Sequence, residues 1–260
     1  MTALVVLFGE GIGYSASPTM HAAAFAALGI DARYELRDVA PAGLAAEVDA
    51  LRGRDRLGAN VTKPHKLAVC DMVDELAPEV ARLGAANTIV RGGDRLVAHN
   101  TDLAAVTAEL RELAGESARP IRTAVVLGAG GASRAVCAAL EDLAIPRVEV
   151  LNRQAWDALP GAVAGADLLI NATPIGTASD ETPVPPPLLR PDLAVLDLVY
   201  RPSPSRLVRD ALGVGAPARG GAGMLLRQAA ASFTLWTGRE APLDVMRAAL
   251  DTELGVAAHA

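Results

Sequence analysis

The sequence TAVVLGAGGAS, residues Thr123–Ser133, joins a continuous apolar run to a glycine-rich turn. The run Thr123–Leu127 is typical of a buried strand in a parallel sheet, and a helix is predicted to follow over Ala132–Leu143. Glycines at such a turn let a pyrophosphate approach the N–H groups at the start of the helix. A glycine turn in any α/β protein can look similar, but the strand and helix around this one favour dinucleotide binding. We therefore predict a dinucleotide site at Gly128, Ala129, Gly130, Gly131, Ala132 and Ser133.

Strands and helices are predicted to alternate on both sides of this turn. Downstream, such alternation favours a parallel sheet with right-handed crossovers, with strands at Arg147–Leu151, Asp167–Asn171 and Leu193–Val199. Upstream, strands and helices are also expected to alternate, and Ser17 caps a helix that has Pro18 at its first position. Its predicted strands are Leu4–Gly9, Arg33–Val39, Leu57–Thr62 and a hairpin of Ala86–Arg91 with Arg95–His99. Two helices, Gly223–Gly238 and Pro242–Leu254, are predicted at the end.

Composition excludes several classes of protein. The 260 residues carry a net charge of −6, which argues against a nucleic-acid partner. Hydrophobic residues make up 51%, enough for a buried core. The longest uncharged stretch, Gly11–Ile30, contains Pro18 and His21 and does not resemble a membrane span. Cys70 and Cys137 are far apart, which suits a reducing cytosol, so we expect a cytoplasmic protein that binds no membrane.

Lysine is confined to one segment of the chain. Of the 24 basic residues only Lys63 and Lys66 are lysine, and both lie within Asn60–Lys66. Unlike arginine, a lysine can exchange a proton near neutral pH when its surroundings lower its pKa. Asp102 begins a predicted helix, where a carboxylate is commonly a cap. The simpler interpretations are a solvated surface lysine for Lys66 and a helix cap for Asp102. The alternative hypothesis is that Lys66 and Asp102 form a proton-handling pair.

The strand after the glycine turn ends in Asn152-Arg153. An NAD site usually has Asp or Glu at this point, to bind the ribose 2′-hydroxyl group. A guanidinium such as that of Arg153 can instead pair with a 2′-phosphate. A surface arginine is the simpler explanation in an arginine-rich chain, but Asn-Arg at this place favours NADP.

Taken together, these motifs resemble the shikimate dehydrogenase family over essentially the full length. The segments that carry the resemblance are Gly13–Pro18 with His21, Asn60–Lys66, Gly84–Thr88, Asn100–Asp102, Gly128–Ser133, Asn152-Arg153, Asn171–Gly176, Asp197–Tyr200 and Gly221–Leu225 with Gln228. All five asparagines and both lysines of the chain fall within them. Many motifs in the same order make a chance match very improbable.

The resemblance implies a two-domain enzyme that reduces the 3-keto group of 3-dehydroshikimate to shikimate with NADPH, in the pathway to chorismate. Residues 1–102 and 223–260 would form an α/β substrate domain, and residues 103–222 a Rossmann-like NADP domain with a parallel sheet. Lys66 and Asp102 would be catalytic. The implied substrate ligands are Ser15, Ser17, Thr62, Asn87, Tyr200 and Gln228. The cofactor would contact the glycine turn together with Asn152, Arg153, Thr173, Leu198 and Gly221.

Some positions depart from the family. Tyr14 stands where the family usually has His, and Ala22 where it usually has Asn. Gln154 replaces a usual Thr, and the helix and strand expected between Asn152 and Asp167 are largely deleted. We therefore expect a more open adenine side of the cofactor site. His21, His65 and His99 are expected to be structural or solvated, with no metal site, because no carboxylate cluster accompanies them.

Two other functions remain open. A relative acting on quinate or aminoshikimate is one, although serine at both Ser15 and Ser17 favours shikimate. A non-catalytic dinucleotide-binding protein is the other, and the presence of Lys66 and Asp102 argues against it. The sequence is compatible with a monomer or a homodimer.

Overall fold

The computed structural model describes residues 2–256, which form two compact units. Unit 1 contains the chain up to Asp102 and again from Leu226, and unit 2 is Leu103–Leu225. The chain leaves unit 1 at the start of helix α4 (Asp102–Glu116) and returns to it within helix α8 (Ala222–Thr237).

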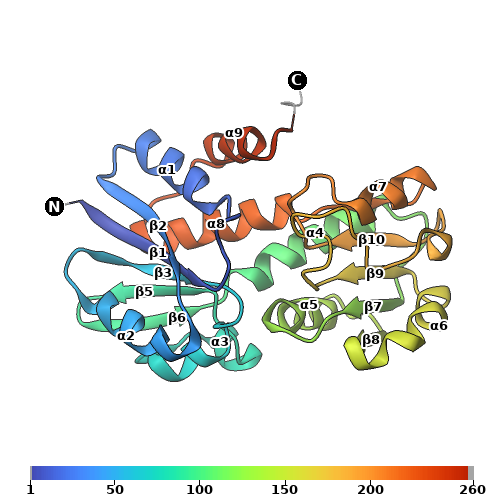
Figure 1. The fold of residues 1–260 in the computed structure, drawn as a ribbon, viewed down its shortest axis with the longest axis horizontal. Coiled ribbons are helices and arrows are strands. Elements are labelled where there is room, and N and C mark those ends of the chain that lie inside the picture. Colours follow the sequence, from blue (N-terminus) through green and yellow to red (C-terminus); the bar gives the residue numbers. More distant parts are fainter. Residues whose placement is uncertain (1, 257–260) are drawn as a thin grey trace. The chain divides into compact units, whose positions relative to one another are not determined.

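Unit 1 contains a mixed six-stranded sheet in the order β2-β1-β3-β5-β6-β4 (Figure 1). The first three strands in this order are parallel, whereas β5 is antiparallel to β3 and forms an antiparallel hairpin with β6. The strands are β1 (Ala3–Gly9), β2 (Ala32–Asp38), β3 (Arg56–Val61), β4 (Glu75–Leu76), β5 (Thr88–Gly92) and β6 (Arg95–His99). The predicted strands and hairpin of this region are therefore present, within two residues at each end.

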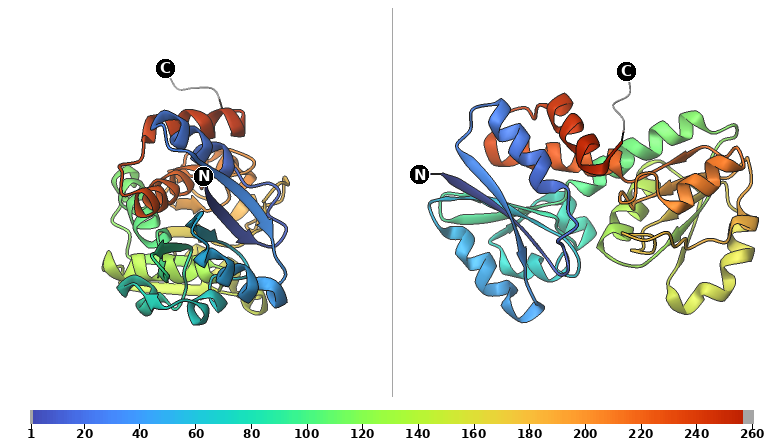
Figure 2. Two further views of the ribbon diagram at one scale, coloured as in Figure 1. Left: turned by 90° about the vertical axis from the view of Figure 1, so that its left-hand side faces the viewer. Right: turned by 45° about the horizontal axis from the view of Figure 1, so that its top comes forward.

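Helices cover both faces of this sheet. Helix α2 (Leu44–Asp49) packs through Leu44 and Val48 into an apolar cluster with β1 and β3, and α3 (Pro78–Leu83) joins it through Val80. Helix α1 (Ser17–Ala27) lies beside α9 (Leu243–Leu254), as Figure 2 shows. Short 3-10 helices occupy Pro41–Gly43, Ala50–Arg52 and Ala68–Met72.

Gly58 lets the second half of α8 reach the sheet. Trp236 of α8 donates its indole N–H to the Ile89 carbonyl oxygen of β5 at 2.9 Å. A Cβ on Gly58 would lie 2.0 Å from that oxygen and 2.7 Å from the indole nitrogen, and Gly58 has a φ of +154°. Only glycine suits this combination of backbone conformation and close approach.

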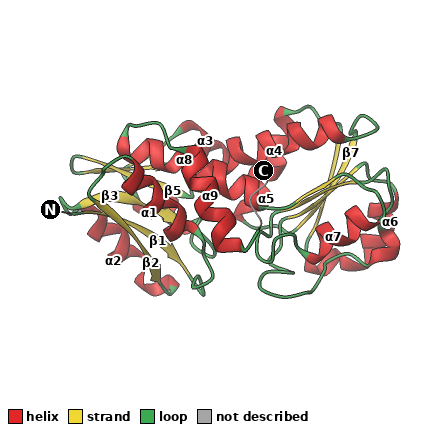
Figure 3. Cartoon of the chain, turned by 90° about the horizontal axis from the view of Figure 1, so that it is seen from above, coloured by secondary structure: helices red, strands yellow, loops and turns green. Residues whose placement is uncertain are grey.

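Unit 2 contains a five-stranded sheet in the order β11-β10-β9-β7-β8, in which every pairing is parallel. Its strands are β7 (Thr123–Leu127), β8 (Arg147–Leu151), β9 (Leu168–Asn171), β10 (Ala194–Asp197) and β11 (Ala218–Arg219). Alternate residues of the central strands enter two separate apolar clusters. One cluster includes α4 and α5 (Gly131–Asp142), and the other α6 (Leu159–Ala164) and α7 (Arg206–Gly213) (Figure 3). The predicted parallel, Rossmann-like sheet is confirmed.

Three local expectations were wrong or incomplete. Ser17 is the first residue of α1 and not its cap. The N-cap of the helix is Ala16, which makes no side-chain capping bond, and the Ser17 N–H donates to Ser15 Oγ at 3.3 Å. The segment after β8, expected to have lost most of its helix and strand, forms a 3-10 helix, Arg153–Ala158, followed by α6, and no strand lies between β8 and β9. Helix α7 was not predicted, although Ser205 caps it by accepting the Val208 N–H at 3.3 Å.

None of the helices within residues 2–256 combines the length and apolar character that crossing a bilayer requires.

Candidate functional site

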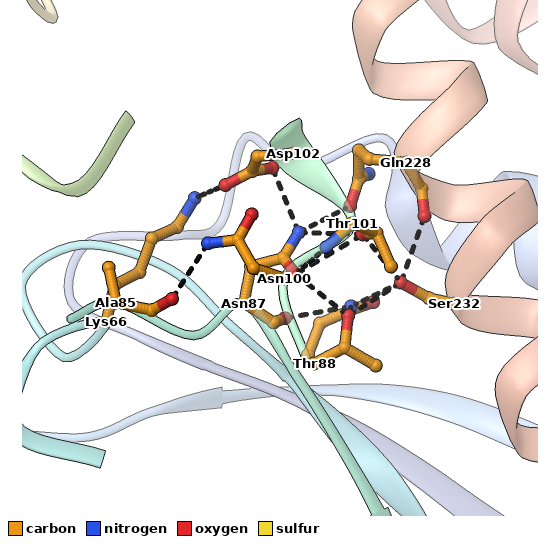
Figure 4. Close-up of polar contacts among 10 residues, drawn as sticks. Lys66, Ala85, Asn87, Thr88, Asn100, Thr101, Asp102, Gln228 and Ser232 are labelled. Carbon is orange, nitrogen blue, oxygen red and sulfur yellow. Dashed lines mark hydrogen bonds and ion pairs between the residues drawn. The ribbon is translucent and has the colours of Figure 1, made fainter. Parts of the chain in front are cut away.

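The Lys66 ammonium and the Asp102 carboxylate meet in unit 1. Lys66 precedes the 3-10 helix Ala68–Met72, and Asp102 is the first residue of α4. Nζ lies 2.6 Å from Oδ2, and the two side chains are 16% and 6% exposed (Figure 4). A lysine donor that is shielded from water but still accessible suits proton transfer to a bound molecule. The hypothesis that pairs these two residues thus agrees with their geometry.

Asn87 fixes the other carboxylate oxygen. Its Nδ2 donates to Asp102 Oδ1 at 2.9 Å, and its Oδ1 accepts the Thr101 N–H at 2.8 Å. A backbone N–H can only donate, so this contact identifies Oδ1 and places the amide N–H₂ group toward Asp102. Asp102 therefore accepts hydrogen bonds at both oxygens, one from Lys66 and one from Asn87, which fixes the orientation of its carboxylate.

Four more of the expected substrate residues lie in this unit with clear neighbours. Gln228 Oε1 accepts from Asn87 Nδ2 at 3.4 Å, which brings α8 to the same group of side chains. Thr62 follows β3, and its N–H donates to the Phe8 carbonyl oxygen at 2.8 Å. A Cβ on Gly9 would lie 2.5 Å from the Thr62 methyl group, so glycine is needed for this close approach. Ser15 and Ser17 contact each other at the start of α1.

Tyr200 and the expected cofactor residues belong to unit 2. The glycine turn connects β7 to α5, with Gly130 as the N-cap. Gly128 has a φ of +109°, and a Cβ there would lie 3.0 Å from the Ala172 carbonyl oxygen. Ser133 Oγ donates to the Gly128 carbonyl oxygen at 2.7 Å and so closes the turn from within the helix. Ala129 and Gly130 stay exposed, which leaves backbone N–H groups at a helix N-terminus accessible to an anion.

Asn152 and Arg153 have different tasks at the end of β8. The Asn152 side-chain oxygen accepts the N–H groups of Gln154 and Ala155 at 2.9 and 3.2 Å and caps the 3-10 helix. Arg153 is exposed, and within residues 2–256 no carboxylate pairs with it. Its guanidinium is therefore available for a phosphate, whereas Asn152 builds the turn.

Asn171 and Asp197 join the two loops that carry Thr173 and Leu198. Asn171 Nδ2 donates to Asp197 Oδ1 at 2.9 Å, and Asn171 Oδ1 accepts the Thr173 hydroxyl at 2.6 Å. Asp197 also accepts the Ser205 hydroxyl at 2.6 Å, yet burial outweighs these bonds and raises the pKa of its carboxyl group. Gly221 lies close to the backbone of Leu198, because a Cβ on Gly221 would be 2.2 Å from the Leu198 carbonyl oxygen.

Three histidines, His21, His65 and His99, contact neighbouring side chains or backbone in unit 1. His21 is fully buried and stacks on Tyr34 at 4.5 Å, and neither ring nitrogen has a hydrogen-bond partner among the described residues. Burial lowers the pKa of His21 to about 3, so the ring is neutral. His65 Nε2 lies 2.6 Å from the Val39 carbonyl oxygen, and His99 contacts Glu79. Residues 2–256 contain no group of His, Cys, Asp and Glu side chains arranged to bind a metal ion.

Comparisons with known proteins agree with these observations. The "Shikimate dehydrogenase substrate binding domain" family matches residues 7–89, and the "Shikimate 5'-dehydrogenase C-terminal domain" family matches residues 221–250. Shikimate dehydrogenase (NADP⁺) of Halorubrum lacusprofundi is 44% identical over 95% of this chain and 98% of its own. The chain belongs to the shikimate dehydrogenase family. The corresponding enzyme of Moorella thermoacetica is 40% identical over 98% of this chain and 94% of its own.

Solved structures of the family have the same fold. The shikimate dehydrogenase of Thermus thermophilus, crystallised with NADP(H) and shikimate, superimposes with a TM-score of 0.85 at 35% identity, over 97% of this chain and all of its own. A quinate dehydrogenase from Corynebacterium glutamicum, crystallised with NAD, superimposes with a TM-score of 0.83 at 29% identity over 96% of this chain and 99% of its own. The expected family and the fold class are confirmed.

Sequence reasoning missed the residues behind the Lys66–Asp102 pair. Tyr34 and Ser232 take part in the same buried hydrogen-bond network as Asn60 and Thr88, and neither was singled out. The one available signal for Ser232 is its place four residues after Gln228, which puts both on one face of a helix.

Proposed function

We propose that this chain catalyses the reversible, NADPH-dependent reduction of 3-dehydroshikimate to shikimate. The observation that carries the proposal is the Lys66–Asp102 pair, held at 2.6 Å and oriented by Asn87, in a chain of this family. Reduction of a ketone adds hydride to the carbonyl carbon and a proton to the oxygen. NADPH, when bound, supplies the hydride.

Lys66 supplies the proton. As hydride reaches the carbonyl carbon, negative charge develops on the oxygen, and the Lys66 ammonium stabilises that charge and donates a proton to it. Asp102 keeps the lysine side chain in place, and Asn87 in turn orients the Asp102 carboxylate by donating to its second oxygen. In the direction of oxidation, the neutral Lys66 amine takes the proton from the substrate hydroxyl group.

Substrate binding is assigned mainly to hydroxyl and amide groups. Ser15 and Ser17 would donate to the substrate carboxylate, which suits a small anion in an acidic chain. The substrate hydroxyls and the remaining contacts of the carboxylate would be bound by Thr62, Asn87, Tyr200 and Gln228. In this proposal unit 1 is the substrate domain.

Unit 2 is the dinucleotide domain in this proposal, and its residues suit NADP. Gly128 to Ser133 expose N–H groups at the start of α5, where a pyrophosphate is stabilised. Asn152, Thr173, Leu198 and Gly221 would line the cofactor. The guanidinium of Arg153, which pairs with no carboxylate of residues 2–256, suits the 2′-phosphate of NADP. We further propose a cytoplasmic location, which two free cysteines suit, and a monomer or homodimer, which light scattering would resolve.

The test is to measure the oxidation of shikimate and quinate side by side, with NADP⁺ and with NAD⁺. Preference for shikimate and NADP⁺ supports the proposal. Preference for quinate would assign the chain to the second candidate, which the similarity to a quinate dehydrogenase favours. Absence of activity on both acids with either cofactor, in protein that binds NADPH, would make it a non-catalytic binding protein.

A further inference from the structure

A buried network of hydroxyl and amide groups lies behind the Lys66–Asp102 pair, and the reaction mechanism described above does not use it. The network begins at Tyr34, whose hydroxyl donates to Asn60 Oδ1 at 2.8 Å. Asn60 Nδ2 in turn lies 3.1 Å from both Thr88 Oγ1 and Ser232 Oγ. All of these side chains are less than a tenth exposed, so the groups depend on one another for hydrogen bonds.

Ser232 is the junction of this network (Figure 4). Its hydroxyl oxygen lies 2.8 Å from Thr88 Oγ1, 3.2 Å from Thr101 Oγ1 and 3.1 Å from Asn60 Nδ2, and it donates to the Gln228 carbonyl oxygen at 2.9 Å. These neighbours come from β3, β5, the start of α4 and α8. Ser232 is fully buried, so water cannot replace any of these contacts.

The direction of the hydrogen bonds leads from Ser232 to Asp102. Because the Ser232 proton goes to the Gln228 carbonyl oxygen, Ser232 can accept from the Thr101 hydroxyl. Asn87 Nδ2 donates to Thr101 Oγ1 and to Asp102 Oδ1, both at 2.9 Å, and its 3.4 Å contact with Gln228 Oε1 is the longest of the three. Thr101 is also the residue before Asp102, so it links Ser232 to the carboxylate through both the backbone and Asn87.

We infer that Ser232 is a positioning residue, which acts through Thr101 and Asn87 to hold the Asp102 carboxylate, and with it Lys66, in the orientation for proton transfer. This inference rests on the proposed function. Ser232 does not touch the pair itself. Its loss would leave Thr101, Thr88 and Asn60 with their other partners, so the fold would persist while the orientation of Asp102 would loosen.

The test compares Ser232→Ala, Thr101→Val and the double variant in steady-state kinetics of shikimate oxidation. Thr101→Val keeps the backbone N–H that orients Asn87 and removes only the hydroxyl. A displacement of about 1 Å can cost roughly 100-fold in rate, so a partial loosening should lower kcat by about tenfold in each single variant. KM for shikimate should change less than kcat, by about twofold or less, because neither Ser232 nor Thr101 is among the assigned substrate ligands.

The double variant separates positioning from simple loss of stability. If both hydroxyls act through the same contact, the double variant loses about tenfold in kcat, not the roughly hundredfold of two independent effects. Thr234→Ala is the matched control, because Thr234 lies on the same helix and also donates to the carbonyl oxygen four residues back. It should leave kcat unchanged.

Three results would overturn the inference. One is a Ser232→Ala variant with the kcat of wild type, whatever its melting temperature. Another is a double variant whose loss equals the product of the single losses. A third is a Thr234→Ala variant that loses as much kcat as Ser232→Ala. These three results all require a wild type that oxidises shikimate. A wild type without this activity would instead refute the proposed function, and the positioning role with it.

Discussion

Replacing Lys66 tests the proposed mechanism most directly. Lys66→Ala removes both the proton donor and the positive charge near the carbonyl oxygen. Lys66→Arg keeps the charge, but a guanidinium does not release its proton near neutral pH. Lys66 Nζ lies 2.6 Å from Asp102 Oδ2 and both side chains are largely shielded, so the variants act on a defined contact.

The magnitude follows from what each variant loses. A positioned general acid is worth roughly 10²–10⁴-fold in rate. Lys66→Ala also loses the stabilisation of the developing negative charge, so its kcat should fall about 10⁴-fold, at the upper end of that range. Lys66→Arg should fall about 10²-fold, because it loses only the proton transfer. Shikimate binding should change little in both, since hydroxyl and amide groups are assigned to hold the substrate.

Two assays separate these effects. Steady-state rates of NADPH formation from shikimate give kcat, and isothermal titration calorimetry gives the affinity for shikimate. A Lys66→Arg variant with more than a third of the wild-type kcat would refute proton donation by Lys66. A Lys66→Ala variant that fails to bind shikimate would show that Lys66 acts in binding and not in the chemical step.

Three further predictions concern cofactor choice, pH and packing. Arg153→Ala should weaken NADPH binding by about 10- to 100-fold, the equivalent of roughly 1.5–3 kcal/mol, and leave NADH binding unchanged; kcat/KM for both cofactors at one salt concentration would show it, and equal losses would contradict it. Burial raises the pKa of the Asp197 carboxyl group. The stability that this group adds to the folded state is therefore fully present below pH 3.8 and is lost as the pH rises through the raised pKa. The advantage of wild type over Asp197→Asn in urea unfolding should therefore be smaller at pH 7 than at pH 4, and a constant difference would contradict this. Gly58→Ala should destabilise the protein by about 4 kcal/mol or more, because the added methyl group meets the backbone. Gly115→Ala, in open space on α4, should instead stabilise it by about 0.5–1 kcal/mol in thermal unfolding, and similar effects of the two changes would contradict the packing argument.

The order of elements was predictable where hydrophobic pattern and turn chemistry agree. Thr123–Leu127 and Arg147–Leu151 are strands with the predicted ends, because an apolar run followed by glycine or Asn-Arg leaves little choice. Helix α7 was missed, since a helix of eight residues carries a short periodic signal that lies between proline-rich turns. The Ser17 cap was wrong because the helix begins at Ser17 itself, which places Ala16 at the N-cap position.

The reactive groups of the candidate site could be predicted from the sequence, but the side chains that hold them in place could not. Lys66 and Asp102 stand out because lysine is rare in this chain and Asp102 starts a helix. Ser232 could not be paired with Thr101 from sequence, because that contact joins residues 131 positions apart. Hydroxyl side chains are common in all parts of a chain, and only the packing of α8 on the sheet selects this one.

The division of tasks at the end of β8 has a consequence for protein engineering. Asn152 maintains the backbone turn, and Arg153 contributes no hydrogen bond or ion pair to the described part of the chain. Changes at exposed positions of this kind usually alter stability by less than about 0.5 kcal/mol. A combinatorial library that varies position 153 and retains Asn152 would therefore explore coenzyme preference while nearly all of its members still fold.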